Sequence, residues 1–220
     1  MIMCTCKPSF PQIIAVTNRN LCRRPFLEQI ERICEHRPKG IILREKDLDE
    51  DEYTLLAKQV LDITRRYRIP CILHTYVRTA RMLHCPTIHL PLPLLREYAG
   101  LLREYAGQAL PTDVHRQQAE PPDADFPGYF REVGCSVHHR NEAEEAVRLG
   151  ATYLTAGHIY STDCKKGVPP RGLSFLREIC QSVSVPVYAI GGIRLDGTQL
   201  QEIRDCGAAG GCVMSGMMEL

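Results

Sequence analysis

The feature that most constrains this chain is a regular alternation of short β-rich runs with helical patterns along most of its 220 residues. Several runs are continuously apolar, as strands buried on both faces of a parallel sheet should be. Between two of them, Leu56, Val60, Ile63 and Tyr67 recur at helical spacing within residues 51–67. The predicted strands are residues 13–18, 40–45, 70–75, 87–91, 134–138, 153–159, 186–193 and 210–216.

Local signals add three more helices. Asn141 followed by Glu144 has the form of a capping box, and Gly150 stands where a C-terminal cap glycine belongs. Residues 172–181 and 196–206 show the other two helical patterns.

Eight strands with intervening helices predict an α/β fold, a small (β/α)8 TIM barrel. A doubly wound open sheet is the alternative, but it usually carries a glycine-rich turn after its first strand, and residues 17–20 (TNRN) are not one. We expect a single domain over residues 1–220, with a leader at 1–12. A surface loop rich in Pro and Asp is expected at 108–130.

The end of the chain and one repeat are irregular. The chain stops four residues after the predicted eighth strand, so we expect the eighth helix to be missing or truncated. Either a neighbouring subunit of a homo-oligomer covers that strand, or the chain is cut short. Residues 94–100 are repeated at once as 101–107, and seven residues make about two helical turns. The repeat therefore predicts a longer fourth helix that keeps its apolar face.

Composition excludes several classes of partner. The net charge is +1, from 27 basic and 26 acidic residues, which argues against nucleic acid or an anionic membrane. No run of about 18 apolar residues is present, and the N-terminus lacks the pattern of a signal peptide. The eleven cysteines are odd in number and form no Cys-x-x-Cys pair, and with no export signal they indicate reduced thiols and a cytoplasmic location.

Chemistry is expected at the carboxyl ends of the strands, where barrel enzymes build their sites. Gly191 and Gly192 end the seventh predicted strand, and Ser215 and Gly216 end the eighth. Backbone N–H groups approach a phosphate closely when no Cβ intervenes, so these ends predict a phosphate-binding site. The simpler interpretation of the paired glycines is a chain turn.

Basic residues and one histidine complete the predicted site. Arg44 and Lys46 lie two apart at the end of the second strand, and Lys165 lies in a loop that ends in glycine. They suit an anionic substrate, although a solvated turn and a flexible charged loop are the alternatives. His138 follows Ser136 at the fifth strand end and can exchange a proton near neutral pH. The spacing of the histidines and cysteines around the fourth strand does not fit zinc, so no metal site is predicted.

At these residues the sequence resembles the thiamine phosphate synthase/TenI superfamily of small barrels. The resemblance covers residues 13–217 and rests on residues 43–46 (LREK), 134–138 (GCSVH), 150–153 (GATY) and 189–193 (AIGGI). The most specific segment, residues 157–167 (GHIYSTDCKKG), is more similar to the TenI-type thiazole tautomerases than to the synthases.

The synthase type is disfavoured by two positions. By resemblance, a synthase holds Mg²⁺ with two aspartates, one after an Asn at the third strand end and one after the fourth strand. Here the first pair reads His74-Thr75, and residues 91–94 (PLPL) contain no carboxylate. Mg²⁺ usually takes one or two carboxylates, so the pyrophosphate leaving group would lack its main charge neutraliser.

The resemblance therefore implies an isomerase, a thiazole tautomerase of thiamine biosynthesis. It aromatises a carboxythiazole phosphate by proton transfer and needs no cofactor or metal. His138 matches the catalytic histidine, and the residues expected to bind substrate are Arg44, Lys46, Ser136, Lys165, Gly191, Gly192, Ser215 and Gly216. Two alternatives remain: a thiamine phosphate synthase that joins a thiazole phosphate to a pyrimidine pyrophosphate, and a non-catalytic barrel that binds a phosphorylated ligand.

Overall fold

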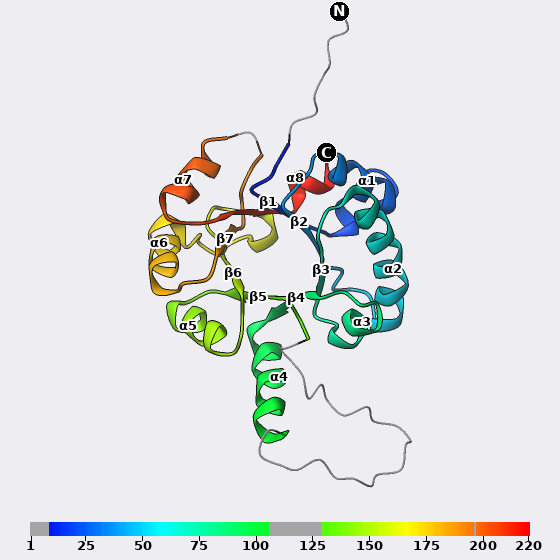
Figure 1. Cartoon of the computed structure of the whole chain (residues 1–220). Coiled ribbons are helices and arrows are strands. Elements are labelled where there is room, and N and C mark those ends of the chain that lie inside the picture. Colours follow the sequence, from blue (N-terminus) through cyan, green and yellow to red (C-terminus); the bar gives the residue numbers. More distant parts are fainter. Residues whose placement is uncertain (1–8, 106–128, 196) are drawn as a thin grey trace, which may run out of the picture.

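A computed structural model describes residues 9–105, 129–195 and 197–220. Its eight parallel strands pair in sequence order, and β8 pairs with β1 to close a barrel that the helices surround (Figure 1). The predicted (β/α)8 fold is therefore confirmed, and the open sheet is excluded. The strands are β1 (Ile13–Val16), β2 (Gly40–Leu43), β3 (Cys71–His74), β4 (Thr87–Pro91), β5 (Glu132–Val137), β6 (Tyr153–Gly157), β7 (Val187–Ile190) and β8 (Gly210–Val213).

Most strands end earlier than the sequence predicts. β1 stops at Val16 because Asn18 begins a short 3₁₀ helix and accepts a hydrogen bond from the backbone N–H of Asn20 at 3.2 Å. β8 stops at Val213, so Ser215 and Gly216 open a short helix and do not end a strand. The helical elements are η1 (Arg19–Leu21), α1 (Phe26–Glu35), α2 (Glu50–Tyr67), α3 (Val77–Met82), α4 (Leu92–Tyr105), α5 (Arg140–Arg148), η2 (Asp163–Lys165), α6 (Gly172–Ser182), α7 (Gln199–Asp205) and α8 (Ser215–Met218).

The capping box predicted at Asn141 and Glu144 is wrong. Helix α5 begins at Arg140 with His139 as its cap, two residues before the predicted cap, and Glu144 instead pairs with Arg140 at 2.8 Å. A capping box does begin α2, where Asp49 accepts from the Glu52 backbone N–H at 2.9 Å. The short pattern is common in sequences, so it does not by itself identify a helix start.

The structure also tests the predicted start of one helix and the predicted end of another. The helix predicted for residues 196–206 begins only at Gln199, whose side-chain oxygen accepts from the Arg194 backbone N–H at 2.8 Å. Residue 196 lies outside the described residues, as do residues 1–8 of the predicted leader and 106–128, which include most of the predicted loop. Gly150 follows α5 with a positive φ of 100°, as predicted for a residue that ends a helix.

The strands separate two apolar layers. Side chains on their outer faces pack against the helices in the main core, where Leu43, Leu73 and Ile88 are fully buried. A smaller cluster fills part of the barrel interior and includes Ile14 and Ile72. The outer layer is the larger of the two, as expected for a barrel whose interior also forms the floor of a site.

The eighth helix is short, in keeping with the prediction for this end of the barrel. The four residues of α8 bury Met217 and Met218 completely, and the side-chain amide of Gln29 on α1 donates to the Met217 carbonyl at 2.6 Å. Part of the region beside β8 is thus covered by residues of the same chain. Helix α4 runs through the first copy of the repeat and to Tyr105 in the second, and it projects beyond the barrel (Figure 1).

Among the described helices, none has both the length and the hydropathy that a membrane-spanning segment requires.

Candidate active site

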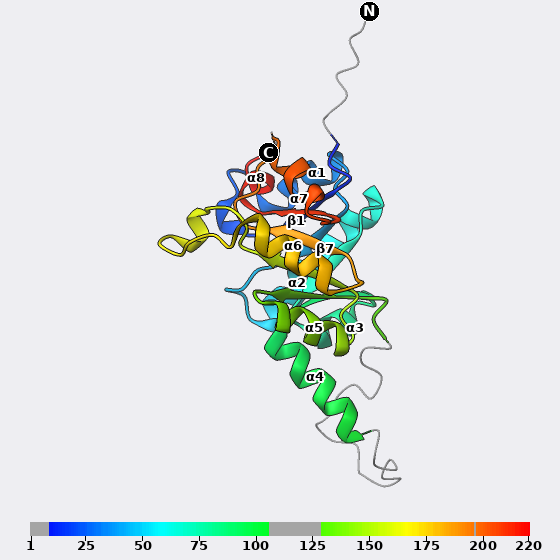
Figure 2. The ribbon, with the colours of Figure 1, turned by 90° about the vertical axis from the view of Figure 1, so that its left-hand side faces the viewer.

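A cavity of about 1550 Å³ opens at the carboxyl ends of the strands. Pockets for a single small molecule usually measure about 300–1,000 Å³, so this one has room for two small ligands. The segment between β6 and α6 projects from the barrel beside it (Figure 2). All nine residues predicted for the site line this cavity: Arg44, Lys46, Ser136, His138, Lys165, Gly191, Gly192, Ser215 and Gly216.

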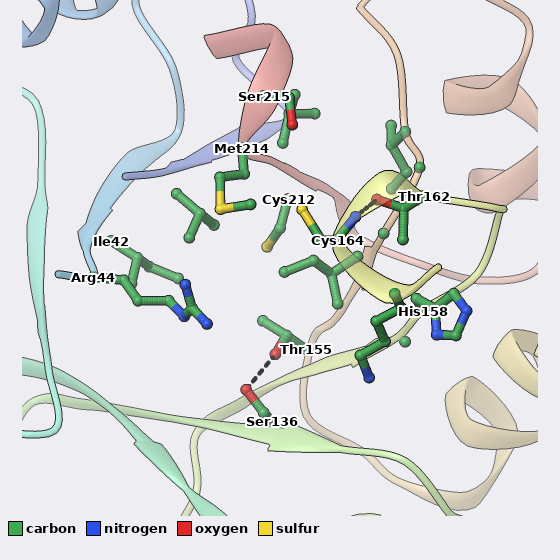
Figure 3. A pocket seen from close by; sticks show the side chains of 18 of the residues that line it. Ile42, Arg44, Ser136, Thr155, His158, Thr162, Cys164, Cys212, Met214 and Ser215 are labelled. Atoms are coloured by element: carbon green, nitrogen blue, oxygen red, sulfur yellow. Dashed lines mark hydrogen bonds between the residues drawn. The ribbon is translucent and has the colours of Figure 1, made fainter. Parts of the chain in front are cut away.

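One wall of the cavity is cationic. Figure 3 shows the guanidinium of Arg44 extending into the cavity from the segment that follows β2. Burial lowers the pKa of Arg44, and the pKa of Lys46 is lowered first by the charge of Arg44, then by burial and by Lys165. Each charge therefore destabilises the next, and an anion bound among them would relieve that repulsion.

Glu45 lies between Arg44 and Lys46 in the sequence, but its carboxylate is engaged by other residues. It is buried, and its carboxylate accepts a hydrogen bond from the Thr17 hydroxyl at 2.6 Å. The backbone N–H of Arg19 donates to the same carboxylate at 3.0 Å, and the Arg19 guanidinium at 3.3 Å. This network fixes the turn after β2 and so holds Arg44 at the cavity mouth.

The glycines after β7 have a packing reason to be glycine. Gly191 and Gly192 adopt positive φ angles of 95° and 71°, which side-chain-bearing residues rarely adopt. A Cβ on Gly191 would collide with His158, and one on Gly192 would collide with the carbonyl oxygen of Ser161. The glycines thus let the β6–α6 segment lie across the end of β7, which accounts for them without a phosphate. Their amides as phosphate donors remain a proposal.

The β6–α6 segment carries the loop cations. Lys165 is exposed in η2, which Thr162 caps by accepting from the Cys164 backbone N–H at 3.4 Å. The base of the segment is tied by the Arg171 backbone N–H, which donates to the His158 carbonyl at 2.9 Å. The ring of His158 is buried in the wall, and its Nδ1 lacks a hydrogen-bond partner within the described chain.

His138 reaches the cavity with a defined tautomer. Its Nδ1 lies 2.8 Å from the carbonyl oxygen of Gly157, which can only accept, so Nδ1 carries a hydrogen, and in the neutral form of the ring Nε2 has the lone pair. Its backbone N–H donates to the carboxylate of Glu142 at 2.6 Å, which anchors the start of α5. His138 is therefore placed to accept a proton or hydrogen bond through Nε2.

Around Ser136, the floor of the cavity holds polar residues that were not predicted for the site. His89 Nδ1 lies 3.0 Å from the Tyr153 hydroxyl, and His89 Nε2 lies 2.8 Å from Ser136 Oγ. The Thr155 hydroxyl donates to Ser136 Oγ at 3.1 Å (Figure 3). The His74 ring stacks on His89 with centroids 5.6 Å apart. Burial lowers the pKa of His74 to about 2 and that of His89 to about 3, so both rings are neutral.

The residues present do not fit a magnesium site. Among the described residues, no three His, Cys, Asp or Glu side chains come together as metal ligands. His74 and Thr75 occupy the third strand end, where Thr75 Oγ1 lies 2.6 Å from His74 Nδ1. The carboxylate of Glu45 is occupied as described above, and Asp163 is exposed on the loop. A hard dication prefers oxygen ligands, and this donor set does not supply a cluster of them.

Fold and cavity together define a class: a small (β/α)8 barrel whose strand ends gather cations and glycine turns around one large cavity. Within that class, the chain belongs to the TMP-TENI family, described as thiamine monophosphate synthase, which matches residues 13–94 and 111–217. The unmatched stretch, 95–110, contains the whole second copy of the repeat, as expected of an insertion.

Individual relatives agree with the family. A putative thiamine-phosphate synthase 2 from Aquifex aeolicus is 30% identical over 183 residues, which cover 83% of this chain and 86% of that protein. A thiamine-phosphate synthase from Syntrophomonas wolfei is 28% identical over 210 residues, with 92% and 86% covered. The solved thiamine phosphate pyrophosphorylase from Pyrococcus furiosus superposes with a TM-score of 0.70 at 26% identity, covering 94% of this chain and 87% of that one.

These relatives overturn the tautomerase prediction. Two of them are named thiamine-phosphate synthase and the third thiamine phosphate pyrophosphorylase, and none of the three carries the name of a tautomerase or other isomerase. The prediction gave most weight to one loop, residues 157–167, and to two missing carboxylates, whereas the similarity extends across the barrel. The synthase alternative agrees better with the comparisons.

Proposed function

We propose that this protein is a transferase of the thiamine phosphate synthase type. It would join a thiazole phosphate to a pyrimidinylmethyl diphosphate, forming thiamine phosphate and releasing pyrophosphate. One observation carries the proposal: a single cavity of about 1550 Å³ has cations on one wall and glycine-rich turns on another. Two anionic ligands can therefore bind side by side. The synthase names of the relatives support the same reaction.

Each wall of the cavity would bind one of the two ligands. Arg44, Lys46 and Lys165 would hold the diphosphate, because they lie together, and no ion pair within the described chain engages them. The phosphate tail of the thiazole would bind near Gly192 and Ser215, which both line the cavity, because backbone amides can bind a phosphate closely. Binding both ligands in one cavity turns the encounter of two molecules into a step within one complex.

The chemical step needs charge stabilisation more than proton transfer. The bond between the pyrimidinylmethyl carbon and the diphosphate oxygen breaks, and its electron pair leaves with the diphosphate. The lone pair of the thiazole nitrogen then forms the new carbon–nitrogen bond. Arg44 and its neighbours stabilise the growing negative charge on the leaving group. His138 would accept a hydrogen bond from the substrate through Nε2, as its tautomer allows.

A second candidate is a non-catalytic barrel that binds a phosphorylated ligand. The missing cluster of carboxylates favours it, because synthase relatives are expected to hold Mg²⁺ and the described residues offer no such site. In this case the cationic wall and the glycine turns would bind the ligand without supporting transfer.

One experiment separates the two candidates. The full chain is incubated with the thiazole phosphate and the pyrimidinylmethyl diphosphate, with Mg²⁺ or with EDTA, and thiamine phosphate is measured by chromatography. Product that Arg44→Gln reduces and the exposed Arg65→Gln control does not reduce supports the transferase. Calorimetric binding of the thiazole phosphate without product supports the binding protein. Neither product nor binding would overturn both.

Two coarser expectations extend this proposal. The nine cysteines of the described chain are free thiols, which supports the proposed cytoplasmic location. Small phosphorylated molecules are the proposed partners, and a homo-oligomer stays a prediction.

A further inference from the structure

One hydrogen bond at the rim of the cavity ties the β6–α6 segment to helix α7. The Tyr160 hydroxyl donates to the Glu202 carboxylate at 2.6 Å, and both residues are partly buried. Burial, followed by this hydrogen bond, raises the pKa of Tyr160, so the hydroxyl keeps its hydrogen and acts as the donor. Neither residue was predicted for the site, although Tyr160 lines the cavity.

Tyr160 packs directly against the glycine turn that follows β7. Its backbone N–H donates to the Gly191 carbonyl at 3.0 Å, and the preceding N–H, of Ile159, donates to the Ile190 carbonyl at 2.9 Å. A Cβ on Gly192 would lie only 2.8 Å from the Cβ of Tyr160, which is too close for two carbon atoms. Tyr160 therefore contacts the turn with its backbone at one glycine and with its side chain at the next.

Helix α7 holds the other side of the same turn. Gln199, the first residue of the helix, accepts a hydrogen bond from the backbone N–H of Arg194 at 2.8 Å, just after the turn. Ile203 is fully buried in the main core, which anchors the helix on the barrel. Glu202 precedes Ile203, so its carboxylate is presented to Tyr160 from an anchored element. The turn is thus held between two elements that this hydrogen bond joins.

The turn uses its carbonyl groups and leaves N–H groups unused. The carbonyls of Ile190 and Gly191 accept hydrogen bonds from the β6–α6 segment, as described above. Within the described chain, the backbone N–H groups of Gly192 and Ile193 have no hydrogen-bond partner, and both residues line the cavity. Backbone N–H groups in a turn can bind the oxygens of an anion such as phosphate. Their direction depends on the elements that hold the turn.

We infer that Tyr160 and Glu202 are positioning residues that hold the Gly191–Gly192 turn in the shape in which its N–H groups bind a phosphate group. The inference rests on the proposed function only for the molecule that carries this phosphate, a thiazole phosphate. The pair acts through the backbone of the turn. Without the hydrogen bond, the Tyr160 side chain can move away from Gly192, and ordering the turn again would cost part of the binding free energy.

The test is a titration of the full chain, labelled with nitrogen-15, with inorganic phosphate and NMR detection. The amide of Gly192 reports binding at the turn, and the Nε–H of Arg44 reports the cationic wall in the same sample. Tyr160→Phe and Glu202→Ala should each weaken binding at the Gly192 reporter about three- to tenfold, the value of one hydrogen bond. The midpoint at the Arg44 reporter should stay as in the wild type, whereas a general loss of structure would change both.

A conservative variant and a double variant separate this hydrogen bond from other effects of the substitutions. Glu202→Gln keeps an oxygen that can accept from Tyr160, so its midpoint at the Gly192 reporter should lie within about twofold of the wild type. Tyr160→Phe combined with Glu202→Ala should bind no more weakly than either single variant, because both substitutions remove the same interaction.

Tyr129→Phe is the matched control. The Tyr129 hydroxyl donates to the Arg81 carbonyl at 3.5 Å, and Tyr129 precedes β5 and so lies at the end of the barrel opposite the cavity. Removing this hydroxyl should leave both reporters unchanged.

Four results would contradict the inference: no response of the Gly192 amide in the wild type, an unchanged midpoint in Tyr160→Phe, a loss in Glu202→Gln as large as in Glu202→Ala, or an equal loss at both reporters. Phosphate binding alone is measured. The expected pattern without any thiamine phosphate formation would therefore reject the proposed function and leave this inference standing. Thiamine phosphate formation with normal phosphate binding by Tyr160→Phe would do the reverse.

Discussion

The two faces of the barrel strands are built from different chemistry. On β5, the outward-facing Val133, Cys135 and Val137 are fully buried against the helices, whereas Ser136, and His138 just after the strand, line the cavity. The outer face thus supplies apolar burial, which is not directional and stabilises the fold. The inner face supplies polar side chains such as His89 and Ser136, which are hydrogen-bonded to each other and line the cavity.

The interior itself is also divided. Ile14, Ile42 and Ile72 make the β1–β3 side apolar, whereas His89 and Thr155 make the β4–β6 side polar. Residues of both sides line the cavity, Ile42 from the apolar side and His89 and Thr155 from the polar side. The cavity floor is therefore apolar on one side and polar on the other.

The largest expected effect comes from the outer face. Leu73→Ala removes a fully buried side chain, and we expect it to lower the free energy of unfolding by about 2–5 kcal/mol. Leu55→Ala is the control, because Leu55 is 72% exposed on α2, and it should cost less than about 0.5 kcal/mol. Urea unfolding measures both. Equal losses would show that the outer layer is not the stabilising face.

The cationic wall should affect binding and leave stability almost unchanged. Arg44→Gln should weaken the binding of inorganic pyrophosphate about 10- to 100-fold, the value of hydrogen bonds to a charged group. Calorimetry in EDTA measures it, with Arg65→Gln as the surface control. An affinity that appears only when Mg²⁺ is added would contradict the assignment of charge neutralisation to the side chains.

Gly134→Ala tests the close packing of Gly134 against Tyr153 and His89 in the barrel interior. The added methyl collides with the Tyr153 ring and with His89, so we expect a loss of about 1–3 kcal/mol in unfolding free energy. Gly197→Ala is the control, since a Cβ there meets only a backbone nitrogen at 3.9 Å. A Gly134→Ala variant as stable as the wild type would show that Tyr153 and His89 can accommodate the added methyl group.

The buried imidazoles predict a pH dependence of stability. In the unfolded chain they bind protons near pH 6.5, but in the fold the pKa of His74 is about 2 and that of His89 about 3. The unfolded state therefore binds more protons between these values, and stability should fall as the pH drops below about 6.5. Each histidine contributes at most about 1.4 kcal/mol per pH unit.

His74→Gln should flatten this profile, because it removes one buried imidazole. His84→Asn is the matched control, since His84 is exposed and its positive φ of 50° suits asparagine. Urea unfolding between pH 7 and pH 4.5 measures the slopes. An unchanged slope in His74→Gln would show that this ring is already protonated in the fold.

The fold could be predicted from the sequence because each strand and helix has a local sequence pattern. The apolar runs predicted all eight strands, and their order predicted the barrel. Boundaries were less accessible, since they depend on single contacts such as the Asn18 side chain that ends β1. The false capping box at Asn141 shows the converse, because the pattern occurs at a residue that does not cap the helix.

The site was predictable only in part. The rule that strand ends carry the chemistry placed Arg44 and His138 in the cavity, although their roles stay predictions. The pairing of His89 with Tyr153 was not predictable, because it depends on register across three strands and 64 positions of sequence. Gly134 gave no such signal, because the predicted strand began at this residue; only the observed β5 places it inside a strand, where a glycine marks a close approach.

The most direct test of this account is whether one cavity holds two anionic ligands at once. The full chain is titrated with inorganic pyrophosphate in the calorimeter, first alone and then saturated with the thiazole phosphate. We predict one site for each ligand and a pyrophosphate affinity that the thiazole phosphate does not abolish. Competition between the two ligands for a single site would contradict it.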